Sequence, residues 1–124
     1  MVKSERLLTV FLYLYRDAAN FQAYGGLLLR GACTAKMEHF VRSNCDSHQY
    51  FVAEQVQVPP LYAELYKFSN GPTIDDVAFH EFLGLRPALP EDVESLTCTG
   101  SLYDLVGRFC HVRRWDCTLS PHCW

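Results

Sequence analysis

Six charged and polar side chains interrupt the apolar stretches of this 124-residue chain, where a small sheet would be expected to bury apolar surface. They occur as three neighbouring pairs: Arg16 and Asp17, Glu54 and Gln55, and His80 and Glu81. Charges in such positions cost free energy unless they pair with one another or take part in a function. We refer to these six residues as the polar block.

The polar block has a catalytic and a structural interpretation. A desolvated carboxylate has a raised pKa, so Glu54 or Glu81 could act as a general acid or base. Arg16 would then hold an anionic substrate, and His80 or Gln55 would orient it. This hypothesis predicts a small hydrolase or transferase, and it requires these groups to meet in one cleft. The structural alternative is a salt bridge that fixes strand register, because ion-pair networks give the same pattern.

The elements that must position the polar block follow from the apolar patterning. The predicted strands span residues 8–17, 21–31, 50–58 and 77–85, and the predicted helices run from Thr34 to about Cys45, over 60–69, and from near Ser101. Residues 90–96 add one or two helical turns. The fold class is therefore α+β: a single four-stranded, mostly antiparallel sheet with about three helices, in the order β-β-α-β-α-β-α. Residues 1–114 form one domain, and residues 115–124 form an irregular tail.

The two faces of this sheet differ in composition. Side chains two residues apart share a face, and we expect the more aliphatic phase, which includes Arg16, Glu54 and Glu81, to lie beneath the helices. The opposite phase is aromatic, and its binding candidates are Tyr13, Tyr15, Asp17, Gln55 and Phe82, with His80 beside them. An exposed aromatic face would be an interaction surface. The alternative is that a helix or the tail covers it.

Cysteine and histidine gather near the C-terminus. Cys110, Cys117, His122 and Cys123 are weak candidates for zinc ligands, because their spacing is irregular and contains no Cys-x-x-Cys pair. Lys3 and Arg6 precede an apolar run, but Glu5 and the lack of a cleavage site argue against an export signal. We therefore expect a cytoplasmic protein with reduced thiols and no cofactor.

Charge and motifs exclude several functions. The formal net charge of −3 argues against a dedicated nucleic-acid binder, although Arg108, His111, Arg113 and Arg114 form a short basic patch. Cations at the end of a helix suit its dipole, so the patch requires no ligand. Nucleic-acid association through this patch is the weakest hypothesis. The sequence has no phosphate loop or nucleophile motif, and no stretch approaches the ~20 apolar residues of a membrane helix.

Several segments carry a resemblance to known sequences. They are Tyr13–Asp17, Phe51–Val56, Pro59–Leu61, Asp75 with Asp76, and His80–Phe82. Over about residues 12–86 the chain resembles a group of small bacterial proteins of uncharacterised function. The resemblance implies a bacterial or phage-related, cytoplasmic origin and implies no activity.

The leading hypothesis is a non-catalytic protein–protein interaction module, such as an adaptor, regulator or inhibitor. It would bind a protein partner or a second copy of itself through the aromatic face or the polar block. The enzyme acting on a small anionic ligand is the alternative. We expect no contact with a membrane.

Overall fold

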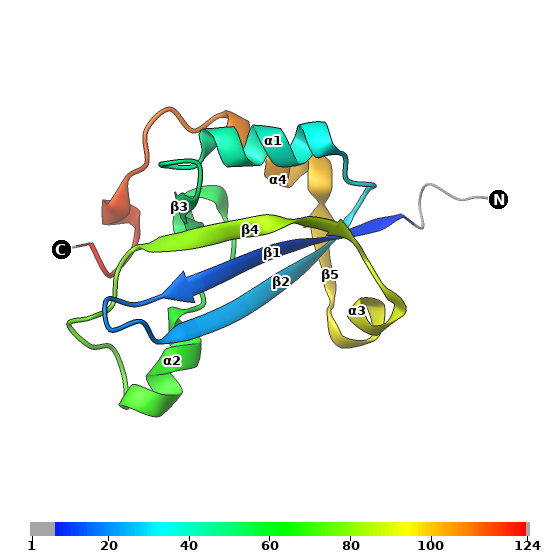
Figure 1. Ribbon diagram of the computed structural model, residues 1–124. Coiled ribbons are helices and arrows are strands. Elements are labelled where there is room, and N and C mark those ends of the chain that lie inside the picture. The colour runs from blue at the N-terminus through cyan, green and yellow to red at the C-terminus, as the bar shows by residue number, and fades with distance from the viewer. Residues whose placement is uncertain (1–6, 124) are drawn as a thin grey trace.

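The first two strands form an antiparallel hairpin at the centre of the sheet (Figure 1). The computed structural model describes residues 7–123, in which β1 (Leu8–Arg16) pairs with β2 (Gln22–Arg30). The Asp17 carboxylate closes the turn by accepting hydrogen bonds from the backbone N–H groups of Ala19 and Phe21, at 3.0 and 2.8 Å. The predicted hairpin is confirmed. Lys3, Glu5 and Arg6, on which the export argument depended, lie outside the described residues.

The other strands extend the hairpin on both sides. The remaining elements are α1 (Ala35–Asn44), β3 (Tyr50–Val52), η2 (Ala53–Val56), α2 (Tyr62–Ser69), β4 (Phe79–Pro87), α3 (Pro90–Ser95), β5 (Cys98–Ser101), α4 (Leu102–Cys110) and η3 (Cys117–Leu119). The sheet order is β3-β4-β1-β2-β5, with β5 parallel to β2 and the other neighbours antiparallel. The α+β class is confirmed. The predicted count was too low, because the described residues contain five strands and four α-helices.

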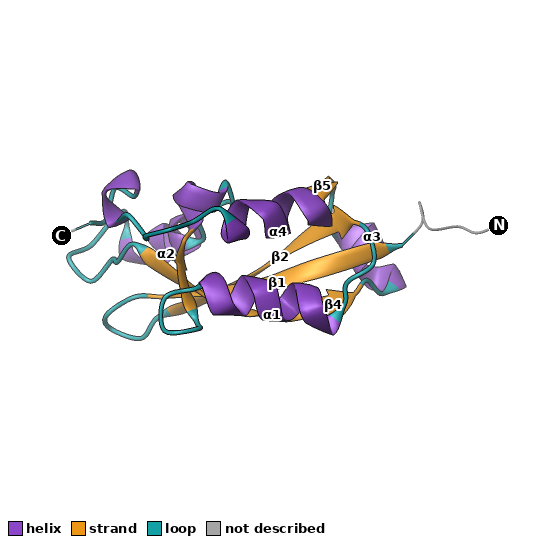
Figure 2. Cartoon of the chain, turned by 90° about the horizontal axis from the view of Figure 1, so that it is seen from above, coloured by secondary structure: helices purple, strands orange, loops and turns teal. Residues whose placement is uncertain are grey.

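Local signals define the helix ends. The Thr34 side chain accepts a hydrogen bond from Met37 N, and the Ser101 side chain accepts one from Asp104 N, so both hydroxyls act as N-caps for α1 and α4. Figure 2 shows these two helices side by side above the strands. Of the helices in residues 7–123, none has the length and apolar character needed to cross a membrane.

The helices cover the aromatic face of the sheet, so the predicted assignment of the two faces was wrong. Phe11 and Phe82 pack in one buried cluster with Val41 of α1 and Phe109 of α4. The rings of Phe11 and Phe109 lie 5.9 Å apart between centroids. Large rings fill the space between a sheet and two helices, and their burial contributes more than that of aliphatic side chains. The aromatic face is therefore the core and cannot serve as a docking surface.

The third predicted strand is also shorter than expected. β3 ends at Val52, and the chain then turns into the 3-10 helix η2. Ala53 and Val56 are buried three residues apart, which is the repeat of a 3-10 helix rather than of a strand. The alternation used to place Glu54 and Gln55 on opposite sheet faces therefore does not apply.

The second face of the sheet is partly covered by α3. Leu96, which follows α3, packs against Gly26 of β2. Arg86 of β4 makes a bidentate ion pair with Asp92 of α3, at 2.6 and 3.0 Å. These contacts hold α3 against the sheet at the same end of the molecule as β5 (Figures 1 and 2).

Candidate functional site

His80 is buried in the core and acts as a hydrogen-bond acceptor. Its ring lies among Tyr13, Tyr15 and Tyr62, with centroid distances of 6.2, 5.0 and 5.7 Å. Its Nε2 accepts a hydrogen bond of 2.9 Å from the Leu61 backbone N–H, at the start of α2. Burial lowers the pKa of His80 to about 4, against a smaller opposing effect of the Ala78 backbone. The imidazole is therefore neutral at pH 7 and fixes the loop before α2.

Glu54 lies on η2 and contacts Tyr62 of α2. Its carboxylate accepts a hydrogen bond from the Tyr62 hydroxyl. Burial, reinforced by this bond to Glu54, raises the pKa of Tyr62, so the phenol keeps its proton and remains a donor. This contact joins two elements that are adjacent in sequence, and it gives Glu54 a structural partner.

Arg16 and Glu81 form the ion pair of the structural interpretation. Arg16 Nε lies 3.0 Å from Glu81 Oε2, between β1 and β4. The second carboxylate oxygen of Glu81 accepts a 2.8 Å hydrogen bond from Gln49 Nε2. Glu81 and His80 are consecutive strand residues, so their side chains leave opposite faces of β4. The structure therefore places the Arg16–Glu81 pair and the His80 ring on different sides of the sheet.

The binding candidates of the aromatic phase make internal contacts within the protein. Tyr13 donates a 2.7 Å hydrogen bond to the Pro59 carbonyl, and burial raises its pKa to about 12. Tyr15 donates to Asp76 at 2.7 Å and accepts from the Val77 backbone N–H at 2.9 Å. Phe82 belongs to the core cluster, and Asp17 closes the β1–β2 turn.

The predicted catalytic set is thus divided: Arg16 and Glu81 pair with each other, whereas Glu54 and His80 both contact Tyr62. His80 also binds the Leu61 backbone. The enzyme hypothesis required these groups to meet in one cleft, which this arrangement does not provide.

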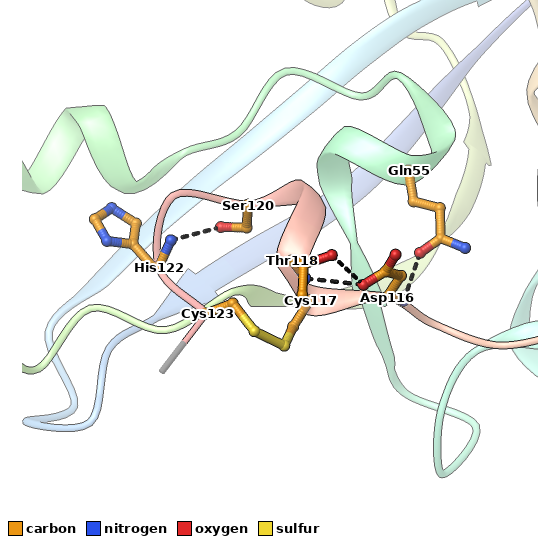
Figure 3. Close-up of a disulfide and its surroundings, with 7 residues drawn as sticks. All are labelled: Gln55, Asp116, Cys117, Thr118, Ser120, His122 and Cys123. Carbon is orange, nitrogen blue, oxygen red and sulfur yellow. Dashed lines mark hydrogen bonds between the residues drawn. A yellow bond between two sulfur atoms is a disulfide. The ribbon is translucent and has the colours of Figure 1, made fainter.

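Gln55, the last member of the polar block, holds the C-terminal segment. Its Nε2 donates to the Arg114 carbonyl and its Oε1 accepts from the Asp116 backbone N–H, both at 2.8 Å. Figure 3 shows Gln55 facing Asp116, beside the disulfide that joins Cys117 and Cys123. The prediction that these two cysteines are reduced thiols was wrong. The amide side chain of Gln55 therefore holds the backbone at both Arg114 and Asp116, on either side of Trp115.

The rest of this segment is anchored by two rings. The Trp115 indole donates a 2.9 Å hydrogen bond to the Asn44 carbonyl and packs against Phe109. His122 is buried, stacks edge-on against Tyr62 at 4.5 Å, and hydrogen-bonds the Tyr66 hydroxyl through Nε2. These contacts attach the segment to α1, α2 and α4.

The weak zinc candidates are used in other ways. Cys117 and Cys123 form the disulfide, His122 lies in the ring cluster, and Cys110 is an exposed free thiol. Within residues 7–123, no group of three or more His, Cys, Asp or Glu side chains is arranged to hold a metal ion.

An open groove of about 860 Å³ runs along α4, and the basic patch lines it. We refer to it as the basic groove, and its lining residues are Gln55, Gln57, Tyr103, Asp104, Gly107, Arg108, His111, Val112, Arg113 and Arg114. Arg108 is oriented by a 2.6 Å hydrogen bond from its Nε to the Val56 carbonyl. The bond from Gln55 to the Arg114 carbonyl positions the backbone of another part of the lining.

The charge of the basic groove is not neutralised by ion pairs. Asp104 is the acidic residue of its lining, against Arg108, Arg113 and Arg114. The salt bridges among residues 7–123 join Arg16 to Glu81, Arg42 to Glu38, Lys67 to Glu64 and Arg86 to Asp92. None of these uses an arginine of the basic groove, which leaves three guanidinium groups to attract an anionic ligand.

Comparisons of the chain with protein-family models, curated protein sequences and solved structures returned no match. The geometry of the site therefore carries the functional argument by itself.

Proposed function

We propose that this chain is a non-catalytic protein-interaction module whose basic groove binds an acidic segment of a protein partner. The observation that carries the proposal is the group of three arginines in the groove, which no carboxylate of the described residues neutralises. In contrast, each residue of the polar block makes at least one internal hydrogen bond or ion pair, although Glu54 Oε1 and His80 Nδ1 have no hydrogen-bond partner among the described residues. A guanidinium matches a carboxylate in both geometry and charge.

Charge favours a protein partner over nucleic acid. The whole chain carries a formal charge of −3, which disfavours a long polyanion that extends beyond the groove. A short acidic segment places its charge only where the arginines lie. Because the contact is electrostatic, its affinity falls as salt is added.

The test uses a short fluorescein-labelled peptide of alternating glutamate and serine, followed by fluorescence anisotropy. The variant combines Arg113→Glu with Arg114→Glu, and we expect it to weaken binding by about tenfold or more, since each charge pair near a surface contributes up to about 1 kcal/mol. The control combines Lys36→Glu with Lys67→Glu, which changes the net charge equally at residues outside the groove lining. It should keep nearly the wild-type affinity.

Three results would contradict the proposal. Equal losses in the two double variants would show that only net charge matters. Equal affinity for a peptide with glutamine in place of glutamate would remove the electrostatic basis. Tighter binding of a single-stranded oligonucleotide than of the acidic peptide would favour the nucleic-acid hypothesis instead.

A further inference from the structure

The basic groove continues into a smaller and more enclosed cavity. This cavity has a volume of about 230 Å³ and lies between β2, β5 and α4. Leu27 and Leu29 of β2 supply apolar lining, and Gln57, Asp104 and Arg108 line both the cavity and the groove. An apolar cavity of about 150 Å³ is large enough to hold benzene. Thr99, Ser101, Asp104 and Arg108 give the cavity a polar lining as well. A ligand that fills both spaces therefore combines an apolar side chain, against the two leucines, with negative charge, against the arginines.

The helix α3 of this chain carries that combination on its surface. Leu89, which precedes the helix as its N-cap, and Val93 within the helix are 50% and 51% exposed. Glu91 and Glu94 are also exposed, and neither takes part in a salt bridge of the described residues. The third acid, Asp92, is bound to Arg86 and holds α3 on the sheet.

The attachment of α3 excludes insertion into the groove of its own chain. Its ion pair with β4 and the packing of Leu96 on Gly26 fix its position, and in that position its glutamates are exposed. The apolar and acidic side chains of α3 therefore remain available to another molecule.

We propose that the partner is a second copy of this chain, whose α3 docks on the basic groove. Leu89, at the start of α3, enters the cavity, while Glu91 and Glu94, three residues apart on one side of the helix, face Arg113 and Arg114. A reciprocal exchange, in which each copy supplies both α3 and the groove, closes a symmetric dimer. The inference rests on the proposed function, since it names the partner of the same groove.

A charge-swap experiment tests this assignment by sedimentation velocity over a range of protein concentrations. One variant combines Glu91→Arg with Glu94→Arg, and the other combines Arg113→Glu with Arg114→Glu. Each variant alone opposes like charges at both contacts and should stay monomeric at concentrations where the wild type dimerises. Their equimolar mixture, and a chain with all four changes, should dimerise again because both contacts are then attractive.

The cavity has its own test. Thr99 is exposed and lines the cavity, so Thr99→Trp should obstruct it and weaken dimerisation by about tenfold, equivalent to about 1.4 kcal/mol. Gln22→Trp, at the other end of β2, adds the same ring at an exposed position and should leave dimerisation unchanged.

The outcomes separate this inference from the proposed function. A wild type that stays monomeric at all concentrations but binds the acidic peptide through the groove would overturn the dimer and leave the proposed function in place. A dimer that survives both swaps would show that its interface lies elsewhere. A wild type that neither dimerises nor binds the acidic peptide through the groove would overturn both the dimer and the proposed function.

Discussion

The polar block and the basic groove contain the same kinds of side chain, but the structure uses them differently. In the block, each charged or polar group has an internal partner, such as Glu81 for Arg16 and the Leu61 backbone for His80. In the groove, Arg108, Arg113 and Arg114 line an open surface together with Asp104, and none of the three forms a salt bridge within the described residues. Residue type and position in a strand therefore do not identify a binding site, and we base the proposed site instead on the open groove and its arginines, which are unpaired within residues 7–123. Variants of the polar block should therefore change the stability of the protein, and variants of the basic groove should change ligand binding.

The largest effect is expected in the aromatic core beneath α1 and α4. Phe51 is buried against Phe11, Tyr13 and Phe109. Phe51→Ala removes these contacts and leaves a cavity, so it should lower the free energy of unfolding by about 3–5 kcal/mol. Urea denaturation followed by circular dichroism measures this, and a loss below about 1 kcal/mol would show that the aromatic face is not the core.

The pH dependence of stability should show that His80 is structural. The pKa of His80 is about 4 in the folded protein and 6.5 when unperturbed, so between these values the unfolded chain binds a proton that the folded chain does not. Stability contributed by neutral His80 is complete above pH 6.5 and is lost as the pH falls toward 4, by up to about 3 kcal/mol.

The matched variant for this test is His80→Gln, which keeps a hydrogen-bond acceptor but does not titrate. Chemical denaturation at several pH values between 7 and 4 should give a flatter profile for the variant than for the wild type. Parallel profiles would mean that His80 has the same pKa in the folded and unfolded states, and the structural assignment would then be wrong.

The disulfide should have an intermediate effect on stability. It closes a loop with a sequence separation of 6 between Cys117 and Cys123. Replacing both cysteines by serine should cost about 2 kcal/mol, because the unfolded chain gains the freedom of an open loop. Gln55 still holds the Arg114 carbonyl, so we expect little change in acidic-peptide affinity. An unchanged free energy of unfolding would show that the cross-link does not constrain this segment.

A smaller effect is expected for the contact between Glu54 and Tyr62. Tyr62→Phe removes the hydroxyl that donates to Glu54 and should lower the unfolding free energy by about 1 kcal/mol. A double-mutant cycle with Glu54→Ala, which removes the acceptor, isolates the pair. A coupling energy near zero would argue against the contact, and a large loss of peptide binding would place this pair in the functional site.

Much of the fold follows from local signals in the sequence. Thr34 and Ser101 are N-caps that the sequence predicts, and the β1–β2 hairpin and the end of α2 are found within a residue or two of their predicted positions. The helix-covered face is harder to predict, because both phases of β1 are apolar and local alternation does not show where a helix packs. β5 has only four residues, of types that are also common in loops.

The candidate site is also hard to predict from the sequence, because it is formed by residues that are far apart in the chain. The sequence identifies the basic patch and Gln55 separately, but Gln55 and Arg114 are 59 residues apart in the chain. Their meeting depends on η2 replacing the end of a predicted strand. The enclosed cavity beneath Thr99 depends on the parallel pairing of β5 with β2. Long-range contacts of this kind leave no periodic pattern in a single sequence.

The different roles of the polar block and the basic groove are best separated by comparing one variant from each region in the acidic-peptide titration. His80→Gln represents the polar block, and the combination of Arg113→Glu with Arg114→Glu represents the basic groove. We predict that His80→Gln lowers stability and keeps the wild-type affinity, while the arginine variant keeps its stability within about 0.5 kcal/mol and loses binding. Loss of binding in His80→Gln, with full binding in the arginine variant, would contradict the account.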